Sequence, residues 1–219
     1  MLRSVLFFLI ILCNSSVWAA EIKFKTQDNA MIYADFQLRG SHAVILAHGA
    51  VFDKDSWGEF KQRLLQENYT VLAIDFRGYN KSTQGDKNQA LYEDILAAVQ
   101  FLTKQKKINK VTVLGASMGG AAAAKASVYS QPETIDQLIL LSPAQVIKPE
   151  KLKGHVLFIA SKAEYRAKSI QSAYKDAADP KKLVLIDGKA HAQHIFKTEQ
   201  AQFLTNTILD FLKMDGINQ

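Results

Sequence analysis

The sequence predicts an α/β protein: a three-layer α/β/α sandwich with a mostly parallel sheet and an antiparallel hairpin at its amino end. Three observations lead to this prediction. Continuous apolar runs recur along the chain, segments of helical period separate them, and two short alternating segments precede the first run. Apolar runs of this length are typical of strands buried on both faces, and their alternation with helices is typical of parallel sheets.

The expected elements can be taken in chain order. Alternating polarity at 22–26 and 31–38, with Gln-Asp-Asn between them, predicts the hairpin. Six apolar runs predict the buried strands, at 43–47, 70–74, 111–114, 135–141, 155–160 and 183–186. Segments of helical period lie between or after them, at 57–67, 91–104, 121–129, 163–177 and 199–214.

Residues 1–19 predict a secretory signal peptide, with a positive residue at Arg3, an apolar run at 5–12, and Val17 and Ala19 placed for cleavage after residue 19. We therefore expect an exported protein, periplasmic or secreted, with one domain over 20–219. The alternative, an uncleaved anchor, is disfavoured because the run is shorter than the ~20 residues that span a bilayer. The single cysteine, Cys13, would leave with the signal.

The charge is basic but dispersed. Lysine and arginine number 27 against 21 acidic residues, for a formal net charge of +6. No basic patch with interleaved aromatic residues accompanies the lysines, so we expect no nucleic-acid partner. We expect no stable membrane insertion after signal cleavage, no cofactor and no metal ion. The sequence favours no particular oligomeric state.

A serine stands at the turn from a predicted strand into a predicted helix. Residues 115–119 read Gly-Ala-Ser-Met-Gly, directly after the apolar run 111–114 and before an alanine-rich segment. In this setting a sharp turn holds Ser117 in a strained conformation, and the flanking glycines allow close backbone approach. The helix N-terminus favours developing negative charge. Ser117 is therefore the candidate nucleophile.

A second turn, His48-Gly49-Ala50-Val51, follows the predicted strand at 43–47. We expect the His48 side chain to be packed or capping, and Gly49 to permit a turn that points the main-chain N–H of Ala50 toward the nucleophile. With the N–H of Met118 it would form an oxyanion hole for a tetrahedral intermediate.

Four motifs stand in the order in which the α/β-hydrolase superfamily has them. They are the turn at His48, Asp-Phe-Arg-Gly-Tyr at 75–79, the Ser117 turn, and Gly-Lys-Ala-His at 188–191. The chain resembles this superfamily over nearly all of residues 21–214. The resemblance implies a serine hydrolase in which the acid follows a late strand and the histidine comes last. Asn80 and Ala192 depart from the family pattern, which often has glycine at both positions, and Arg77 is expected to anchor its loop.

The resemblance implies that His191 is the general base. A neutral imidazole can take the Ser117 proton near physiological pH and return it to the leaving group. His194 is the alternative, three residues on, and the Gly-Lys-Ala-His pattern favours His191. His42 and His155 stand at strand starts and are expected to be structural.

Three residues are candidates for the acid that orients the histidine: Glu164, Asp187 and Asp136. The family places this acid shortly after the fifth of the buried strands, commonly as Asp three residues beyond a glycine. Here Ser161 stands at the glycine position and Glu164 at the acid position. Asp187 would have to fold back to meet the imidazole, and Asp136 begins a strand far from the serine. We expect Glu164, with Asp187 as the alternative.

The interval between the fourth and fifth buried strands, residues 142–154, is too short for a lid domain. We therefore expect no cap domain and an open cleft, rimmed by loops at 52–57 and 143–150, that admits a small acyl substrate. The expected reaction is carboxylic ester hydrolysis through an acyl-enzyme on Ser117; thioesters and amides share this chemistry. The alternatives are a catalytically idle scaffold and a cell-envelope binding protein that uses its basic surface.

Overall fold

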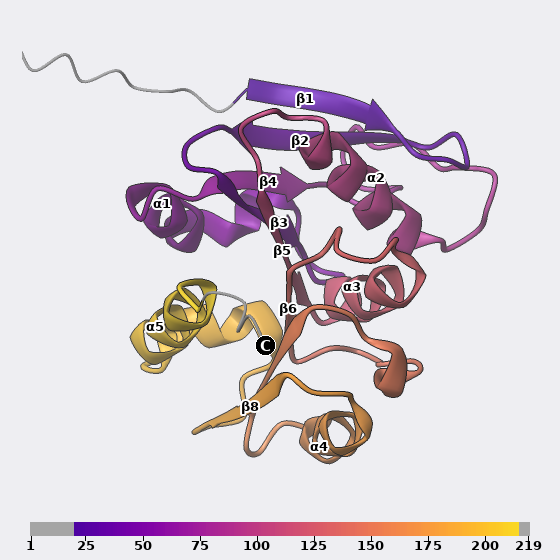
Figure 1. Ribbon diagram of the computed structural model, residues 1–219. Coiled ribbons are helices and arrows are strands. Elements are labelled where there is room, and N and C mark those ends of the chain that lie inside the picture. Colours follow the sequence, from indigo (N-terminus) through magenta and orange to yellow (C-terminus); the bar gives the residue numbers. More distant parts are fainter. Residues whose placement is uncertain (1–19, 215–219) are drawn as a thin grey trace, which may run out of the picture.

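The computed structural model describes residues 20–214, which form an eight-stranded sheet with helices on both faces (Figure 1). The predicted signal peptide, residues 1–19 with Cys13, lies outside the described residues, as do residues 215–219. The first strand begins at Ala20.

The strands are β1 (Ala20–Lys25), β2 (Met31–Gln37), β3 (His42–Ala47), β4 (Thr70–Ile74), β5 (Lys110–Ala116), β6 (Gln137–Leu141), β7 (His155–Ser161) and β8 (Lys181–Ile186). The α-helices are α1 (Gly58–Gln66), α2 (Leu91–Thr103), α3 (Met118–Tyr129), α4 (Ala167–Asp176) and α5 (Ala201–Leu212). Three short 3₁₀-helices, η1 (Lys54–Trp57), η2 (Pro149–Lys151) and η3 (Ala192–Lys197), lie in loops.

The strand order is β1-β2-β4-β3-β5-β6-β7-β8. The predicted hairpin is confirmed: β1 and β2 pair antiparallel, with Ile22 opposite Ala34, and β2 pairs antiparallel with β4. The six strands from β3 to β8 run parallel, as predicted from their continuous apolar sequences. Parallel strands end at the same edge of the sheet, so the loops that follow β3 to β8 are brought together there.

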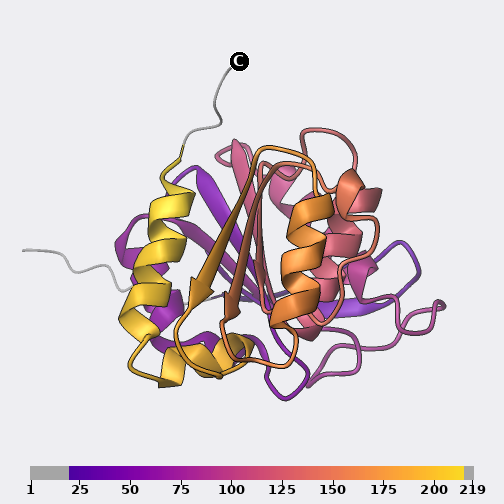
Figure 2. The ribbon, with the colours of Figure 1, turned by 90° about the horizontal axis from the view of Figure 1, so that it is seen from below.

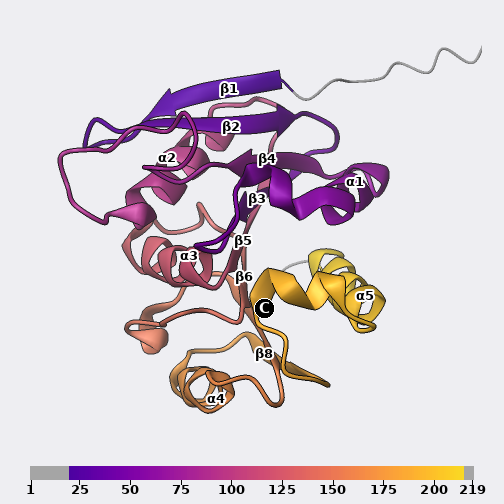
Figure 3. The same cartoon turned by 180° about the vertical axis from the view of Figure 1, so that it is seen from behind.

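Each face of the sheet packs against its own set of helices. Helices α2, α3 and α4 lie on one face and α1 and α5 on the other, as the views from below and behind show (Figures 2 and 3). The first face centres on residues such as Phe158, Ile45 and Ile95, and the second on Leu46, Leu64 and Ile208, all fully buried. The predicted three-layer sandwich is therefore confirmed. No helix in residues 20–214 has the length and apolar character needed to cross a bilayer.

A buried ion network anchors the loop after β4. The guanidinium of Arg77 donates to Asp28 in the hairpin turn, at 2.6 and 2.9 Å, and to Asp94 on α2, at 2.7 and 2.8 Å. All three residues are at most 4% exposed. The hydrogen bonds from Arg77 hold the pKa of Asp28 well below its usual range. The structure thus gives Arg77 the anchoring role expected from the sequence, away from the serine.

The connection between β6 and β7 is as short as expected. Residues 142–154 connect β6 to β7 with only the short η2 helix between them. The predicted helix at 163–177 begins later, at Ala167, because the chain first turns at Ser161–Glu164, with the Glu164 N–H donating to the Ser161 carbonyl. That turn carries one of the candidate site residues.

Candidate active site

Ser117 lies at the sharp turn between β5 and α3, as predicted. Its backbone has φ 50° and ψ −110°, a conformation that costs free energy for any residue other than glycine. A Cβ added to Gly115 would lie 2.3 Å from the Gly119 carbonyl oxygen, and one added to Gly119 would lie 2.2 Å from the Ala47 oxygen. Both glycines are therefore required because the backbone approaches so closely at this turn. The turn lifts the half-buried Ser117 hydroxyl above the carboxyl end of the sheet.

The structure brings Ser117, His191 and Glu164 into one hydrogen-bonded chain. Nε2 of His191 lies 2.9 Å from the Ser117 Oγ, and Nδ1 lies 2.5 Å from Oε2 of Glu164. A carboxylate accepts a hydrogen bond from Nδ1–H, which leaves the Nε2 lone pair for the serine hydroxyl. These 3 side chains come from the loops after β5, β7 and β8, and the chain separates Ser117 from His191 by 74 positions.

The Glu164 side chain is completely buried, and each of its oxygens has a partner. Oε1 accepts hydrogen bonds from the Ser142 hydroxyl at 2.6 Å and from the Ser161 N–H at 3.0 Å, while Oε2 faces His191. Ser161 also donates from its hydroxyl to the Ala190 carbonyl at 2.5 Å, joining the end of β7 to the loop of His191. The carboxylate is therefore fixed in orientation, as an acid that orients an imidazole must be.

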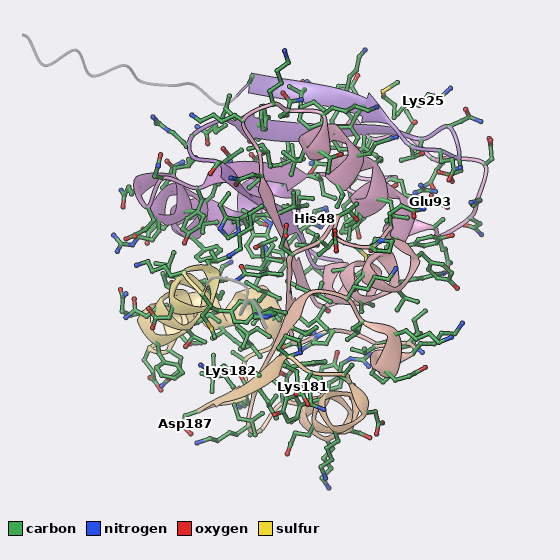
Figure 4. The ribbon with its side chains drawn as sticks, in the orientation of Figure 1. Lys25, His48, Glu93, Lys181, Lys182 and Asp187 are labelled. Carbon is green, nitrogen blue, oxygen red and sulfur yellow. The ribbon has the colours of Figure 1, made fainter. Side chains whose placement is uncertain are left out.

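The rival residues lie elsewhere. Asp187 is at the end of β8, its side chain 73% exposed and paired with Lys162 at 2.5 Å, and Figure 4 shows it at the outer tip of the strand. His194 is exposed and packs its ring on Phe52, with the centroids 5.0 Å apart. Asp136 accepts a hydrogen bond from the Val111 N–H at the amino ends of β5 and β6, the end of the sheet opposite to Ser117.

The two N–H groups expected to form the oxyanion hole remain available. The Met118 N–H is in the first turn of α3, where helical N–H groups have no intrahelical acceptor. Neither it nor the Ala50 N–H donates to a protein acceptor within residues 20–214. Gly49 brings this turn beside the nucleophile: a Cβ added to it would lie 3.5 Å from the Cβ of Ser117.

The structure does not bear out the expected need for glycine at position 49. Gly49 does not adopt a positive φ, so its conformation does not itself require glycine. An added Cβ would lie at ordinary contact distance, 3.5 Å, from Ser117, Gln193 and Phe52, so close packing does not require glycine either. Asn80 and Ala192, which replace frequent family glycines, both have positive φ, at 47° and 53°.

His48 is packed, as expected, and it also orders the turn. Its ring is fully buried (Figure 4), Nε2 accepts from the Phe76 N–H at 3.2 Å, and Nδ1 therefore donates to the Gly49 carbonyl at 2.8 Å. Burial lowers the pKa of His48, although the Gly49 bond and nearby aspartates oppose the shift. The ring is thus neutral and has no role as a base.

Two side chains at the site were not identified from the sequence. Ser142 directly follows β6 and donates to Glu164, and Gln193 on η3 accepts the Gly49 N–H at 2.8 Å. Both are buried polar residues, with 0% and 2% exposure. No local pattern marks either residue, because each acts on a group far away in the chain.

The surroundings of the site are partly apolar and exposed. Val51 is 79% exposed beside the oxyanion turn, and Tyr165 is 75% exposed with its ring centroid 5.2 Å from that of His191. A cavity of about 810 Å³ is lined by the loop that carries His191, by residues of η3 and by the segment that follows η3. Within residues 20–214 no group of three or more His, Cys, Asp or Glu side chains is arranged to hold a metal ion.

Comparison with known proteins agrees with this architecture. A Haemophilus influenzae protein whose name provisionally places it among esterases and lipases is 30% identical over 123 residues, 55% of this chain and 41% of that protein. The chain spans 33% of the length of three mycobacterial relatives, so it matches less than half of each of these curated proteins.

Solved structures match over most of the chain. The Pyrococcus furiosus esterase Pf2001 has a TM-score of 0.78 at 20% identity, covering 90% of this chain and 93% of that one. The esterase EaEST from Exiguobacterium antarcticum has a TM-score of 0.73 at 17% identity, covering 88% and 99%. At these identities the likeness concerns the fold.

The family described as Serine aminopeptidase, S33, matches residues 40–197, which include Ser117, Glu164 and His191. This match covers more than half of the chain. The chain therefore belongs to the serine aminopeptidase S33 family, a family of hydrolases with the α/β-hydrolase fold.

Proposed function

We propose that the protein is a serine hydrolase that cleaves carboxylic esters through an acyl-enzyme on Ser117. The observation that carries this proposal is the hydrogen-bonded chain from Ser117 through His191 to the buried carboxylate of Glu164. The esterase names of the relatives and structural neighbours support an ester as the substrate.

The reaction would run in two balanced steps. The Ser117 Oγ attacks the ester carbonyl carbon while its proton moves to Nε2 of His191, and the carbonyl oxygen becomes an oxyanion held by the N–H groups of Ala50 and Met118. Collapse of this intermediate expels the alcohol, which takes the proton from His191. Water then attacks the acyl-enzyme, gives its proton to His191, and releases the carboxylic acid as Ser117 regains its proton.

The substrate would be a small acyl ester with an apolar part. The absence of a cap leaves Ser117 approachable, and the exposed side chains of Val51 and Tyr165 offer apolar surface on two sides of the site. Thioesters and amides would enter the same chemistry, with the amide the slower because its leaving group needs protonation.

The experiment is a substrate panel run on the wild type and on Ser117→Ala. The panel contains short p-nitrophenyl esters, acyl thioesters and aminoacyl anilides, the last because of the family's aminopeptidase name. We expect hydrolysis of the esters by the wild type and less than about one per cent of it in Ser117→Ala. Equal hydrolysis by the two proteins would overturn the proposal.

The substrate panel, together with fluorophosphonate labelling and binding assays, separates the alternative functions. An idle scaffold would hydrolyse nothing and leave Ser117 unlabelled by a fluorophosphonate. A cell-envelope binding protein would bind anionic vesicles or glycans in a salt-sensitive manner, and that binding would survive Ser117→Ala. Either result without ester hydrolysis would replace the enzymatic proposal.

We also propose that the protein is exported and cleaved after Ala19. The support is the sequence of residues 1–19, with its positive start, its apolar run and its small residues before the expected cleavage point. Mass spectrometry of the protein recovered from the periplasm and the medium tests this. A cytoplasmic protein that keeps Met1 or residues 2–19 would contradict it.

A further inference from the structure

The turn that carries Ala50 is held by its own His48 side chain and by side chains from two other parts of the fold. The Gly49 N–H donates to Oε1 of Gln193 at 2.8 Å. The Gly49 carbonyl accepts from Nδ1 of His48 at 2.8 Å, and the Ala50 carbonyl accepts from the hydroxyl of Tyr79 at 2.8 Å. Of the N–H groups of Gly49 and Ala50, only that of Ala50 is left for a ligand.

Gln193 differs from the other two because it comes from the loop of the general base. It lies two residues after His191, on η3, and is 2% exposed. Its amide nitrogen donates to the Ser56 hydroxyl at 2.9 Å, so both ends of the amide are bonded and its orientation is fixed. One side chain therefore spans from the His191 loop to the turn that holds Ala50 and to the η1 segment behind it.

We propose that Gln193 is a positioning residue that selects and aims the oxyanion donor. By occupying the Gly49 N–H it leaves Ala50 as the donor on this turn, and it ties the position of that donor to the loop that holds His191. Oxyanion donors act only when they point to the place where the charge develops, and a misplacement of about 1 Å can cost about 10²-fold in rate. This inference rests on the proposed hydrolytic function.

Two variants of Gln193 test the hydrogen bond apart from packing. Gln193→Ala removes the side chain, and Gln193→Met keeps most of its volume but has no oxygen to accept the Gly49 N–H. Gln137→Ala is the matched control. Gln137 is also 2% exposed and bridges two segments, from Thr112 to the Phe211 carbonyl, at the opposite end of the sheet.

The readouts are kcat and KM on a short ester, the melting temperature, and the Ki of a trifluoromethyl ketone, whose serine adduct carries an oxyanion. We expect both Gln193 variants to lose about 10- to 100-fold in kcat with KM nearly unchanged. The ketone should bind more weakly by a similar factor. Gln137→Ala should lower the melting temperature but leave kcat and Ki unchanged.

Unchanged kcat and Ki in folded Gln193→Met would overturn the inference, since that variant lacks the hydrogen bond. Equal kcat losses in Gln137→Ala and Gln193→Ala would also overturn it, because they would show a general effect of destabilisation. Failure of the proposed function looks different: a folded wild type would then be no more active than Ser117→Ala and would not bind the ketone, and the inference would fall with it.

Discussion

Nδ1 of His191 lies 2.5 Å from Oε2 of Glu164, a carboxylate whose side chain has no exposure to solvent. Two further donors, the Ser142 hydroxyl and the Ser161 N–H, hold the other oxygen of the same carboxylate. This arrangement orients the imidazole so that Nε2 faces Ser117, and several outcomes can be predicted from it.

Glu164→Gln should lower kcat by two or more decades. The amide oxygen can still accept from Ser142 and Ser161, but the amide nitrogen would then face Nδ1 of His191 and favour the wrong tautomer, an effect of about 10⁴ in a comparable triad. The melting temperature should change little because the shape is kept. Steady-state kinetics beside Asp187→Asn check this: loss of activity only in the Asp187 variant would move the acid to that residue.

Ser142→Ala should weaken catalysis without removing any triad member. Glu164 would keep only the Ser161 N–H on Oε1, and a buried acceptor that loses a donor costs about 1–3 kcal/mol. We expect kcat to fall about tenfold, which is comparable to the loss when a hydrogen-bond partner that orients a metal ligand is removed. Ser127→Ala is the control, since Ser127 is equally buried and bonds Lys153 far from the site. Equal kcat values in the two variants would contradict the prediction.

His191→Ala should lower kcat by about 10⁴-fold or more, since the base is lost. His194→Ala should keep kcat within a few-fold of wild type, because His194 is exposed and its ring packs on Phe52. Initial rates on a short ester, with circular dichroism to verify folding, provide the measurement. A reversal of the two effects would assign the base to His194.

Stability should fall in acid partly because of His42. Burial, with a smaller contribution from the charge of Lys110, lowers the pKa of His42 to about 4. Its unfolded pKa is about 6.5, so the unfolded state binds the proton first as the pH falls. The contribution of His42 to the free energy of unfolding is therefore fully present above about pH 6.5. It falls by up to about 1.4 kcal/mol per pH unit as the pH decreases toward 4.

Urea titrations at several pH values test this prediction. His42→Gln keeps a donor for the Thr112 hydroxyl, which His42 contacts at 2.8 Å, and should show a flatter dependence between about pH 6.5 and pH 4. Identical slopes for His42→Gln and wild type would contradict the prediction.

The sequence was sufficient for features that depend on local chain geometry. The turn at Ser117 could be predicted because a strand, two glycines and a helix start all lie within a few residues of it. Glu164 was expected from the resemblance to the family, which has its acid shortly after the strand that is β7 here, even though Ser161 replaces the usual glycine. The alternation of strands and helices likewise predicted the layers and the hairpin.

Features that depend on distant contacts could not be read from the sequence. Gln193 meets Gly49 across 144 positions of the chain, and Ser142 meets Glu164 across 22, so neither follows from a motif. The expectation that the turn at Gly49 needs glycine was wrong, since neither its φ nor the space around an added Cβ requires that residue. The backbone conformation of this turn follows only from the fold.

Labelling with a fluorophosphonate, followed by peptide mapping, tests the central claim most directly. The reagent needs an activated serine, so the wild type should carry one adduct, on Ser117. Ser117→Ala should remain unlabelled, and His191→Ala should react at least about 100-fold more slowly. An adduct on another residue, or a folded wild type that stays unlabelled, would contradict the assignment of Ser117 as a nucleophile activated by His191.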